Sequence, residues 1–171
     1  LAELRALDAG AWFDPHFSGT QIPTLNELLA LLQRYDGRAY LEFKSAPPAP
    51  VLARVIEADL LDRVFFWSFN RDYLVELRDL SADAQIMSRR QDYPTLADSI
   101  ADFDADLIEF LPGDKPAEIA SLRGSKIRSM IAYMGDDPAV FDHALGLRPD
   151  RFNLNHPFEF ARFVRSQLRD G

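Results

Sequence analysis

The sequence predicts an α/β fold of the (β/α)8 TIM-barrel type, of which about six strand–helix units lie in this chain. Six apolar runs of strand length recur at intervals of 20 to 24 residues, enough for one strand, one helix and two short loops. No hairpin signal joins them, so the strands are expected to be parallel with helical crossovers. No glycine-rich phosphate loop follows a strand, which disfavours a dinucleotide-binding sheet. An open sheet of six parallel strands is the remaining alternative.

The strands and helices are expected at definite positions. The predicted strands are Ala39–Lys44, Val64–Ser68, Ala84–Met87, Asp106–Phe110, Ile127–Ala132 and Phe152–Asn155. Helix starts are marked by capping side chains or by proline at the first helical position: Thr24 with Glu27, Asn70, Thr95 with Asp98, Pro138 and Pro157. The spacing of Phe158, Phe160 and Phe163 predicts that the last helix docks through these rings.

Composition restricts the classes of function. A chain of 171 residues with 47% apolar side chains fits one domain, residues 1–171, with a real core. The absence of cysteine excludes disulfides, thiolate zinc sites and cysteine nucleophiles. A net charge of −8 argues against a nucleic-acid partner, because such proteins need basic patches. No apolar run approaches the roughly 20 residues that a membrane-spanning helix needs.

The strand around Glu42 carries the most chemical information. Side chains alternate across a strand, so Tyr40, Glu42 and Lys44 share one face, while Leu41 and Phe43 share the other. In a barrel the polar set would point inward near the carboxyl end of the strand, where active sites of this fold are built. The alternative is a glutamate–lysine pair on a solvated strand face.

Three segments resemble the glycerophosphodiester phosphodiesterase family. They are Leu1–Phe13 (LAELRALDAGAWF), Ile22–Leu29 (IPTLNELL) and Leu41–Lys44 (LEFK). The run Val64–Phe69, ending in Ser-Phe, and the last strand before Pro157 continue the pattern. The resemblance implies that residues 1–23 are the tail of a family insertion and that residues 24–171 are strands three to eight of a barrel whose first two strands are missing.

The resemblance also implies an activity. Family members hydrolyse glycerophosphodiesters to glycerol 3-phosphate and an alcohol, with a divalent cation and two histidines that act as acid and base. Those histidines would precede Leu1, so no catalytic residue is expected in this chain and the isolated chain is expected to be inactive. Glu42 matches a metal-binding carboxylate, with Ca²⁺ or Mg²⁺ as the cation. Lys44 matches the lysine beside the phosphate.

Four further residues are candidates for the substrate pocket. Phe69 closes the Ser-Phe pair, and Tyr133 stands where the family has a tryptophan motif, so it is a candidate aromatic wall for glycerol. Asn153 and Asn155 share one face of the last strand, where inward amides would bind a hydroxyl or form a satisfied polar layer. The family's acid on this strand is replaced in the run Leu154–Pro157 (LNHP).

The remaining polar candidates have structural interpretations that we favour. His16 reads as a loop residue and His143 as a contact of a surface helix, whereas His156 precedes Pro157 at a strand end on the active face. Glu109, at a strand end, would either approach the barrel mouth or, as we favour, be a solvated loop charge like Asp106 and Asp114. Arg89 and Arg90 end a strand and would meet a phosphate, or form a solvated pair.

Two functions follow from these observations. The first is a metal-dependent phosphodiesterase whose partner is a small glycerophosphodiester. The second is a non-catalytic barrel that serves as a binding or interaction module, and the altered motifs of the last two strands motivate it.

Overall fold

The structure, a computed structural model, describes residues 1–169. Its six strands form one parallel sheet whose spatial order follows the chain, from first to last. The strands are β1 (Ala39–Phe43), β2 (Val64–Ser68), β3 (Gln85–Arg89), β4 (Leu107–Phe110), β5 (Arg128–Tyr133) and β6 (Arg151–Leu154). A sequential parallel order is that of a barrel, and a doubly wound sheet would reverse direction at its middle. The predicted strand positions are therefore confirmed, with ends that shift by one or two residues.

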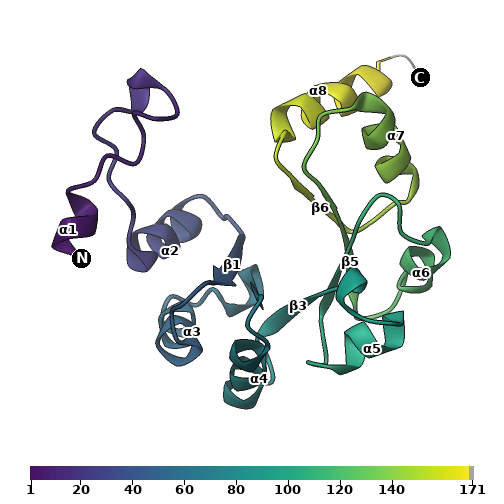
Figure 1. Cartoon of the computed structure of the whole chain (residues 1–171), viewed down its shortest axis with the longest axis horizontal. Helices are drawn as coiled ribbons and strands as arrows, with labels where there is room; N and C mark the ends of the chain where they lie inside the picture. Colours follow the sequence, from purple (N-terminus) through teal and green to yellow (C-terminus); the bar gives the residue numbers. More distant parts are fainter. Residues whose placement is uncertain (170–171) are drawn as a thin grey trace.

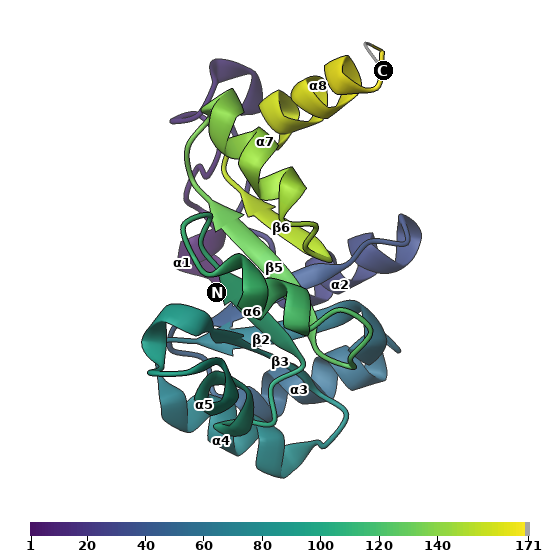
Figure 2. The same ribbon diagram turned by 90° about the vertical axis from the view of Figure 1, so that its right-hand side faces the viewer.

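Helices alternate with the strands along the whole sheet. They are α1 (Ala2–Arg5), α2 (Leu25–Arg34), α3 (Pro48–Glu57), α4 (Arg71–Leu80), α5 (Leu96–Ala101), α6 (Pro116–Ser121), α7 (Pro138–Gly146) and α8 (Pro157–Gln167). The elements follow one another around an arc that is open between the N-terminal segment and the pair α7 and α8 (Figure 1). Turned by a quarter, the view shows β5 and β6 running in the same direction, with α5 and α6 on the outside of the sheet (Figure 2).

The helix starts are those that the capping residues predict. Thr24 and Thr95 each accept a hydrogen bond from the backbone three residues on, and the Glu27 and Asp98 side chains return the bond, so both capping boxes are present. The Asn70 side chain caps α4. Asp137 caps α7, and prolines occupy the first helical positions of α7 and α8. Local chemistry thus sets where each helix begins.

The outer face of the sheet packs against the helices and forms the core. Fully buried side chains on this face include Phe66, Ile86, Ile108 and Ile131, one from each central strand. They belong to two clusters, one around β1 to β3 and one around β4 and β5. Burial of this size is the main source of stability in a domain of this kind.

The last helix docks through two of the three phenylalanines that its spacing indicated. Phe160 and Phe163 lie 5.2 and 6.0 Å, by ring centroids, from Phe141 of α7. Phe160 also contacts Phe152 of β6 at 4.8 Å. Phe158 is 80% exposed, so its expected docking role is wrong. A residue at the second position of the helix is turned away from the face that carries the other two.

The segment before α2 is organised around one carboxylate. Asp8 accepts hydrogen bonds from the backbone N–H groups of Gly10, Ala11 and Gly19, at 2.8 to 2.9 Å. These bonds lower the pKa of Asp8 to about 2. Gly10 is required here because a Cβ atom would lie 2.1 Å from the carbonyl oxygen of Phe17. The Asp-Ala-Gly run therefore fixes the conformation of this loop. From the sequence alone, the run is only part of the resemblance to the family.

Candidate active site

Charged and aromatic side chains line the hollow side of the sheet near the carboxyl ends of the strands. The strand register pairs Glu42 of β1 with Trp67 of β2, and Arg89 of β3 with Glu109 of β4. Asn153 of β6 reaches the same level, since its amide bonds to Glu109. Active sites of parallel barrels are built at this end of the strands.

Glu42 and Lys44 form an ion pair at the tip of β1, within hydrogen-bond contact. The Glu42 side chain is 26% exposed and that of Lys44 is 70% exposed. The carboxylate therefore lies at the edge of the hollow formed by the carboxyl ends of the strands, here called the rim, and the amine projects further into solvent. Tyr40 lies two residues before Glu42, on the same face of β1. Burial is the main cause that raises its pKa, and the charges of Glu109 and Glu42 raise it further. The predicted inward face of β1 is therefore Tyr40, Glu42 and Lys44, as alternation requires.

Phe69 connects Lys44 to a second cation. The Lys44 Nζ lies 5.6 Å from the centroid of the Phe69 ring, and the Arg89 guanidinium carbon lies 5.4 Å from it. Trp67 packs edge-on against Phe69 at 4.3 Å between ring centroids. Ser68 fixes this corner because its Oγ donates to the Phe43 carbonyl at 2.8 Å and accepts from the Asn70 N–H at 3.0 Å. Two cations thus flank one exposed aromatic ring at the rim.

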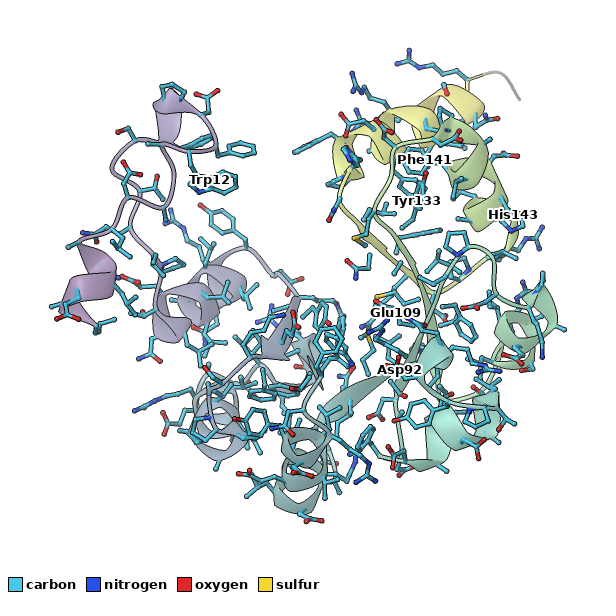
Figure 3. All side chains as sticks on the ribbon, in the orientation of Figure 1. Trp12, Asp92, Glu109, Tyr133, Phe141 and His143 are labelled. Atoms are coloured by element: carbon cyan, nitrogen blue, oxygen red, sulfur yellow. The ribbon has the colours of Figure 1, made fainter. Side chains whose placement is uncertain are left out.

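A chain of polar contacts crosses the hollow from β3 to β6. Arg89 Nε lies 3.7 Å from a carboxylate oxygen of Glu109, and Asn153 Nδ2 donates to the other oxygen at 3.1 Å. Burial raises the pKa of Glu109, while Asn153 and Arg89 oppose the rise. Glu109 lies toward the middle of the arc (Figure 3). The expectation that Glu109 is a solvated loop charge is wrong: it is 7% exposed and belongs to the inner face of a central strand.

Arg89 and Glu109 are the site residues that sequence reasoning undervalued. Alternation carried the signal for both, since Glu109 shares a face with Leu107, and Arg89 shares one with Met87. Arg90, the next residue, points to the helix side and pairs with Glu118 of α6. The expected solvated arginine pair is therefore divided between the two sides of the sheet.

Two predicted pocket residues lie elsewhere. Tyr133 faces the helix layer, where its ring packs edge-on against Phe141 of α7 at 5.8 Å between centroids (Figure 3). Its expected place as an aromatic wall for glycerol is therefore wrong, because it shares the outward phase of Ile131. Asn153 faces inward as expected, whereas Asn155 lies just beyond β6 and is exposed.

The histidines stand apart from the Glu42–Lys44 pair in their contacts. His16 is exposed in the N-terminal segment and contacts Phe17. His143 Nε2 lies 2.9 Å from the Pro112 carbonyl oxygen, which confirms the expected contact of a surface helix. His156 is at the start of α8, with Nδ1 4.0 Å from a Glu159 oxygen.

A divalent cation would be incompletely held by the described residues. Ca²⁺ and Mg²⁺ take six or more oxygen ligands, and Glu42 is a ligand of the right kind. Within residues 1–169, no three His, Cys, Asp or Glu side chains are placed to hold a metal ion together. One carboxylate does not make a cation site, so the described residues alone do not fit such an ion.

The same residues contain no helix long and apolar enough to cross a membrane.

Comparison with known proteins identifies structural relatives. The chain is similar to a glycerophosphodiester phosphodiesterase of Agrobacterium tumefaciens, with a TM-score of 0.87 and 29% identity over 96% of this chain and 70% of that one. A phosphodiesterase of Oleispira antarctica, solved with its product sn-glycerol-3-phosphate, has a TM-score of 0.73 and 18% identity over 96% and 70% of the two chains. A glycerophosphodiester phosphodiesterase of Parabacteroides distasonis has a TM-score of 0.78 and 17% identity over 98% and 71%. The last two share the fold.

Sequence comparison alone finds less. No family model matches the chain, and no curated protein matches it.

Proposed function

We infer that this chain, which belongs to the glycerophosphodiester phosphodiesterase family, forms most of the barrel of an enzyme that hydrolyses glycerophosphodiesters to glycerol 3-phosphate and an alcohol. The single observation that carries the proposal is the pairing of Glu42 and Lys44 on the inner face of β1, at the carboxyl end of the strand. An inward carboxylate and amine are costly to desolvate unless they bind each other or a ligand. Hydrolysis of a glycerophosphodiester, a reaction of glycerophospholipid metabolism, would use both the carboxylate of Glu42 and the amine of Lys44.

The residues of the rim would act mainly on the phosphate. Lys44 would neutralise the charge that builds on the phosphate oxygens in the transition state. Arg89, on the same Phe69 ring, would add a second cation at this position. Phe69 would provide an apolar surface for the carbon atoms of the substrate, since its ring is 73% exposed. Glu109 on the neighbouring strand would hold Arg89 in place, and Asn153 would position Glu109.

Glu42 would be one oxygen ligand of a divalent cation, Ca²⁺ or Mg²⁺. The other ligands and the two acid–base histidines would come from protein outside these 171 residues, in two further strands between β1 and β6. Such a cation would supply Lewis-acid polarisation of the phosphate. The 171 residues by themselves would then be inactive.

The test is the hydrolysis of glycerophosphocholine by the complete protein in the presence of Mg²⁺ or Ca²⁺. Glu42→Gln keeps the shape but removes the charge, and we expect the rate to fall at least about 100-fold, as for the loss of a strong transition-state interaction. The matched control is Glu57→Gln on α3, whose exposed carboxylate also pairs with a cation, Arg54, at 2.6 Å. A normal rate for Glu42→Gln, with the control also normal, would remove Glu42 from the metal site.

A non-catalytic barrel is the second candidate, and one contact favours it. Lys44 donates a hydrogen bond directly to the carboxylate of Glu42, so the two charges neutralise each other without a ligand. Under this alternative the complete protein binds glycerol 3-phosphate, and binding weakens in a Lys44→Gln variant, but no diester is cleaved. Turnover of glycerophosphocholine by the complete protein would exclude it.

A further inference from the structure

The strands β2 and β3 separate before they end. Their register pairs only Phe65 with Gln85 and Phe66 with Ile86, although β2 continues to Ser68 and β3 to Arg89. By contrast, β1 and β2 are paired over five residues, up to Phe43 and Ser68. The separation opens a crevice between the two carboxyl ends, and a cavity of about 470 Å³ occupies it. Small-molecule sites commonly have this size and lie at the carboxyl ends of parallel strands.

One wall of the crevice carries a buried hydroxyl group without a partner. Ser88 is 2% exposed, and among residues 1–169 no group makes a hydrogen bond to its Oγ. The Tyr93 hydroxyl is close enough for Ser88 to lower its pKa, but it makes no hydrogen bond of good geometry with Ser88 and donates its own proton to Asp102 at 2.7 Å. A buried polar atom left unpaired is costly, so it usually marks a place where a water molecule or a ligand completes the bond. Ser88 therefore indicates that the crevice takes up a polar group.

The charges of the crevice balance. Arg71 makes two hydrogen bonds to Asp102, through Nε and Nη2. Arg89 Nε lies 3.8 Å from Asp92. The two guanidiniums and the two carboxylates of the crevice cancel in net charge, so a charged alcohol group gains no large net attraction there, although Arg89 still lies beside the Phe69 ring at the phosphate position.

Aromatic rings complete the lining. Trp67, Phe69 and Phe103 contribute ring surface to the same cavity. Planar polar side chains such as arginine and aspartate, together with serine and tyrosine hydroxyls, offer many donors and acceptors at fixed positions. Ring faces and a dense set of hydrogen-bonding groups without net charge suit an uncharged polyhydroxy compound.

The crevice adjoins the phosphate position. Phe69 and Arg89 line it, and Lys44 lies over the Phe69 ring at 5.6 Å. A phosphate held by Lys44 would therefore have one of its two ester arms directed toward β2 and β3. We propose that this crevice binds the alcohol part of the phosphodiester, and that this alcohol is an uncharged polyol such as glycerol or a cyclitol. The inference rests on the proposed function for the phosphate, but the crevice itself is tested by binding.

The first experiment measures binding of the probes myo-inositol and glycerol to the complete protein by ligand-observed NMR, with choline as the charged competitor. We expect saturable binding of a polyol and none of choline. Ser88→Ala should weaken polyol binding about tenfold, the value of one hydrogen bond of about 1.4 kcal/mol, and Ser88→Thr should restore it. No saturable polyol binding, or equal binding by parent and Ser88→Ala, would overturn the proposal and leave the crevice as a site of hydration only. Preferential binding of choline would also overturn it.

The second experiment measures selectivity. The ratio of kcat/KM for glycerophosphoinositol to that for glycerophosphocholine should exceed one and should fall about tenfold in Ser88→Ala. Ser129→Ala is the matched control: this buried hydroxyl lies on β5 and is already bonded to Asp150 at 3.1 Å, so its loss should leave the ratio unchanged. An unchanged ratio in Ser88→Ala would contradict the crevice while leaving the phosphodiesterase intact. Ser88-dependent polyol binding without any hydrolysis would instead contradict the phosphodiesterase and retain the crevice.

Discussion

Two neighbouring phenylalanines of β2 differ in what surrounds them. Phe66 is fully buried on the helix side, where its ring stacks on that of Phe43 at 5.6 Å between centroids. Phe65 faces the hollow of the arc, where it stacks on Tyr40 at 4.9 Å and carries the Arg151 guanidinium at 5.4 Å. One ring is enclosed by apolar neighbours, and the other lies among polar groups.

The same division extends across the sheet. Ile86, Ile108 and Ile131 fill the outer face of the strands, while Arg89 and Glu109 occupy the inner face. Because side chains alternate, each strand can serve packing on one side and chemistry on the other. The outer face therefore supplies most of the packing that stabilises the fold, with the crevice beside Ser88 as an opening in it, and the inner face is where charge can be held for a ligand.

The largest effect should come from truncating the two phenylalanines. We expect Phe66→Ala to lower the free energy of unfolding by about 3–5 kcal/mol, because a cavity is left among fully buried neighbours. Phe65→Ala should cost less than half as much, since its ring borders a cavity of about 440 Å³ between β1, β2 and β6. Urea unfolding followed by circular dichroism measures both.

Equal losses for the two variants would show that the inner face contributes as much packing as the outer one. The distinction between a stabilising face and a chemical face would then fail.

A smaller effect is expected from Ser68, a polar residue of the outer face. Its hydroxyl bonds the Phe43 carbonyl and the Asn70 N–H and is 5% exposed. Ser68→Ala removes both hydrogen bonds from a buried site, so it should cost about 1–3 kcal/mol. It should also lower the rate of diester hydrolysis, because the corner that places Phe69 beside Lys44 is loosened.

The matched control is Ser121→Ala at the end of α6, where an exposed hydroxyl donates to the Glu118 carbonyl oxygen. We expect it to change stability by less than about 0.5 kcal/mol. If Ser68→Ala behaved like this control, Ser68 would have no part in fixing the rim.

Local rules predicted the order of elements and most of their ends. Strand spacing gave six parallel strands, and capping side chains gave the starts of helices such as those after Thr24 and Thr95. These features depend on residues a few positions apart, so the sequence contains them directly.

The site was predicted less completely, for two different reasons. The resemblance to a family motif predicts Tyr133 in the pocket, whereas its two-residue spacing from Ile131 indicates the helix side, where its ring packs. The crevice beside Ser88 lies where β2 and β3 cease to pair, and its lining combines these strands with residues of α4 and of the segment after α5. No rule based on a single strand contains this information.

The smallest effect concerns two glutamates that pair with consecutive arginines on opposite sides of the sheet. Burial raises the pKa of inner Glu109 beside Arg89, whereas the hydrogen bond from Arg90 lowers the pKa of outer Glu118. As pH rises past about 4.3, the ordinary glutamate value, the unfolded chain releases the Glu109 proton before the folded chain does, so stability falls. For Glu118 the folded chain releases its proton first, so stability rises as pH approaches about 4.3 from below and keeps its full value above that pH.

The substitutions Glu109→Gln and Glu118→Gln should therefore change the pH profile of stability in opposite directions. Relative to the parent, Glu109→Gln should become more stable as pH rises above about 4.3, because the cost of a buried charge is removed. Glu118→Gln should lose stability relative to the parent as pH rises toward about 4.3 and should keep that loss above it, because a favourable ion pair with Arg90 is missing. Urea unfolding at a series of pH values measures both differences. Parallel profiles would mean that Glu109 is as well compensated inside the arc as Glu118 is outside it, and the inner face would then have no charge held ready for a ligand.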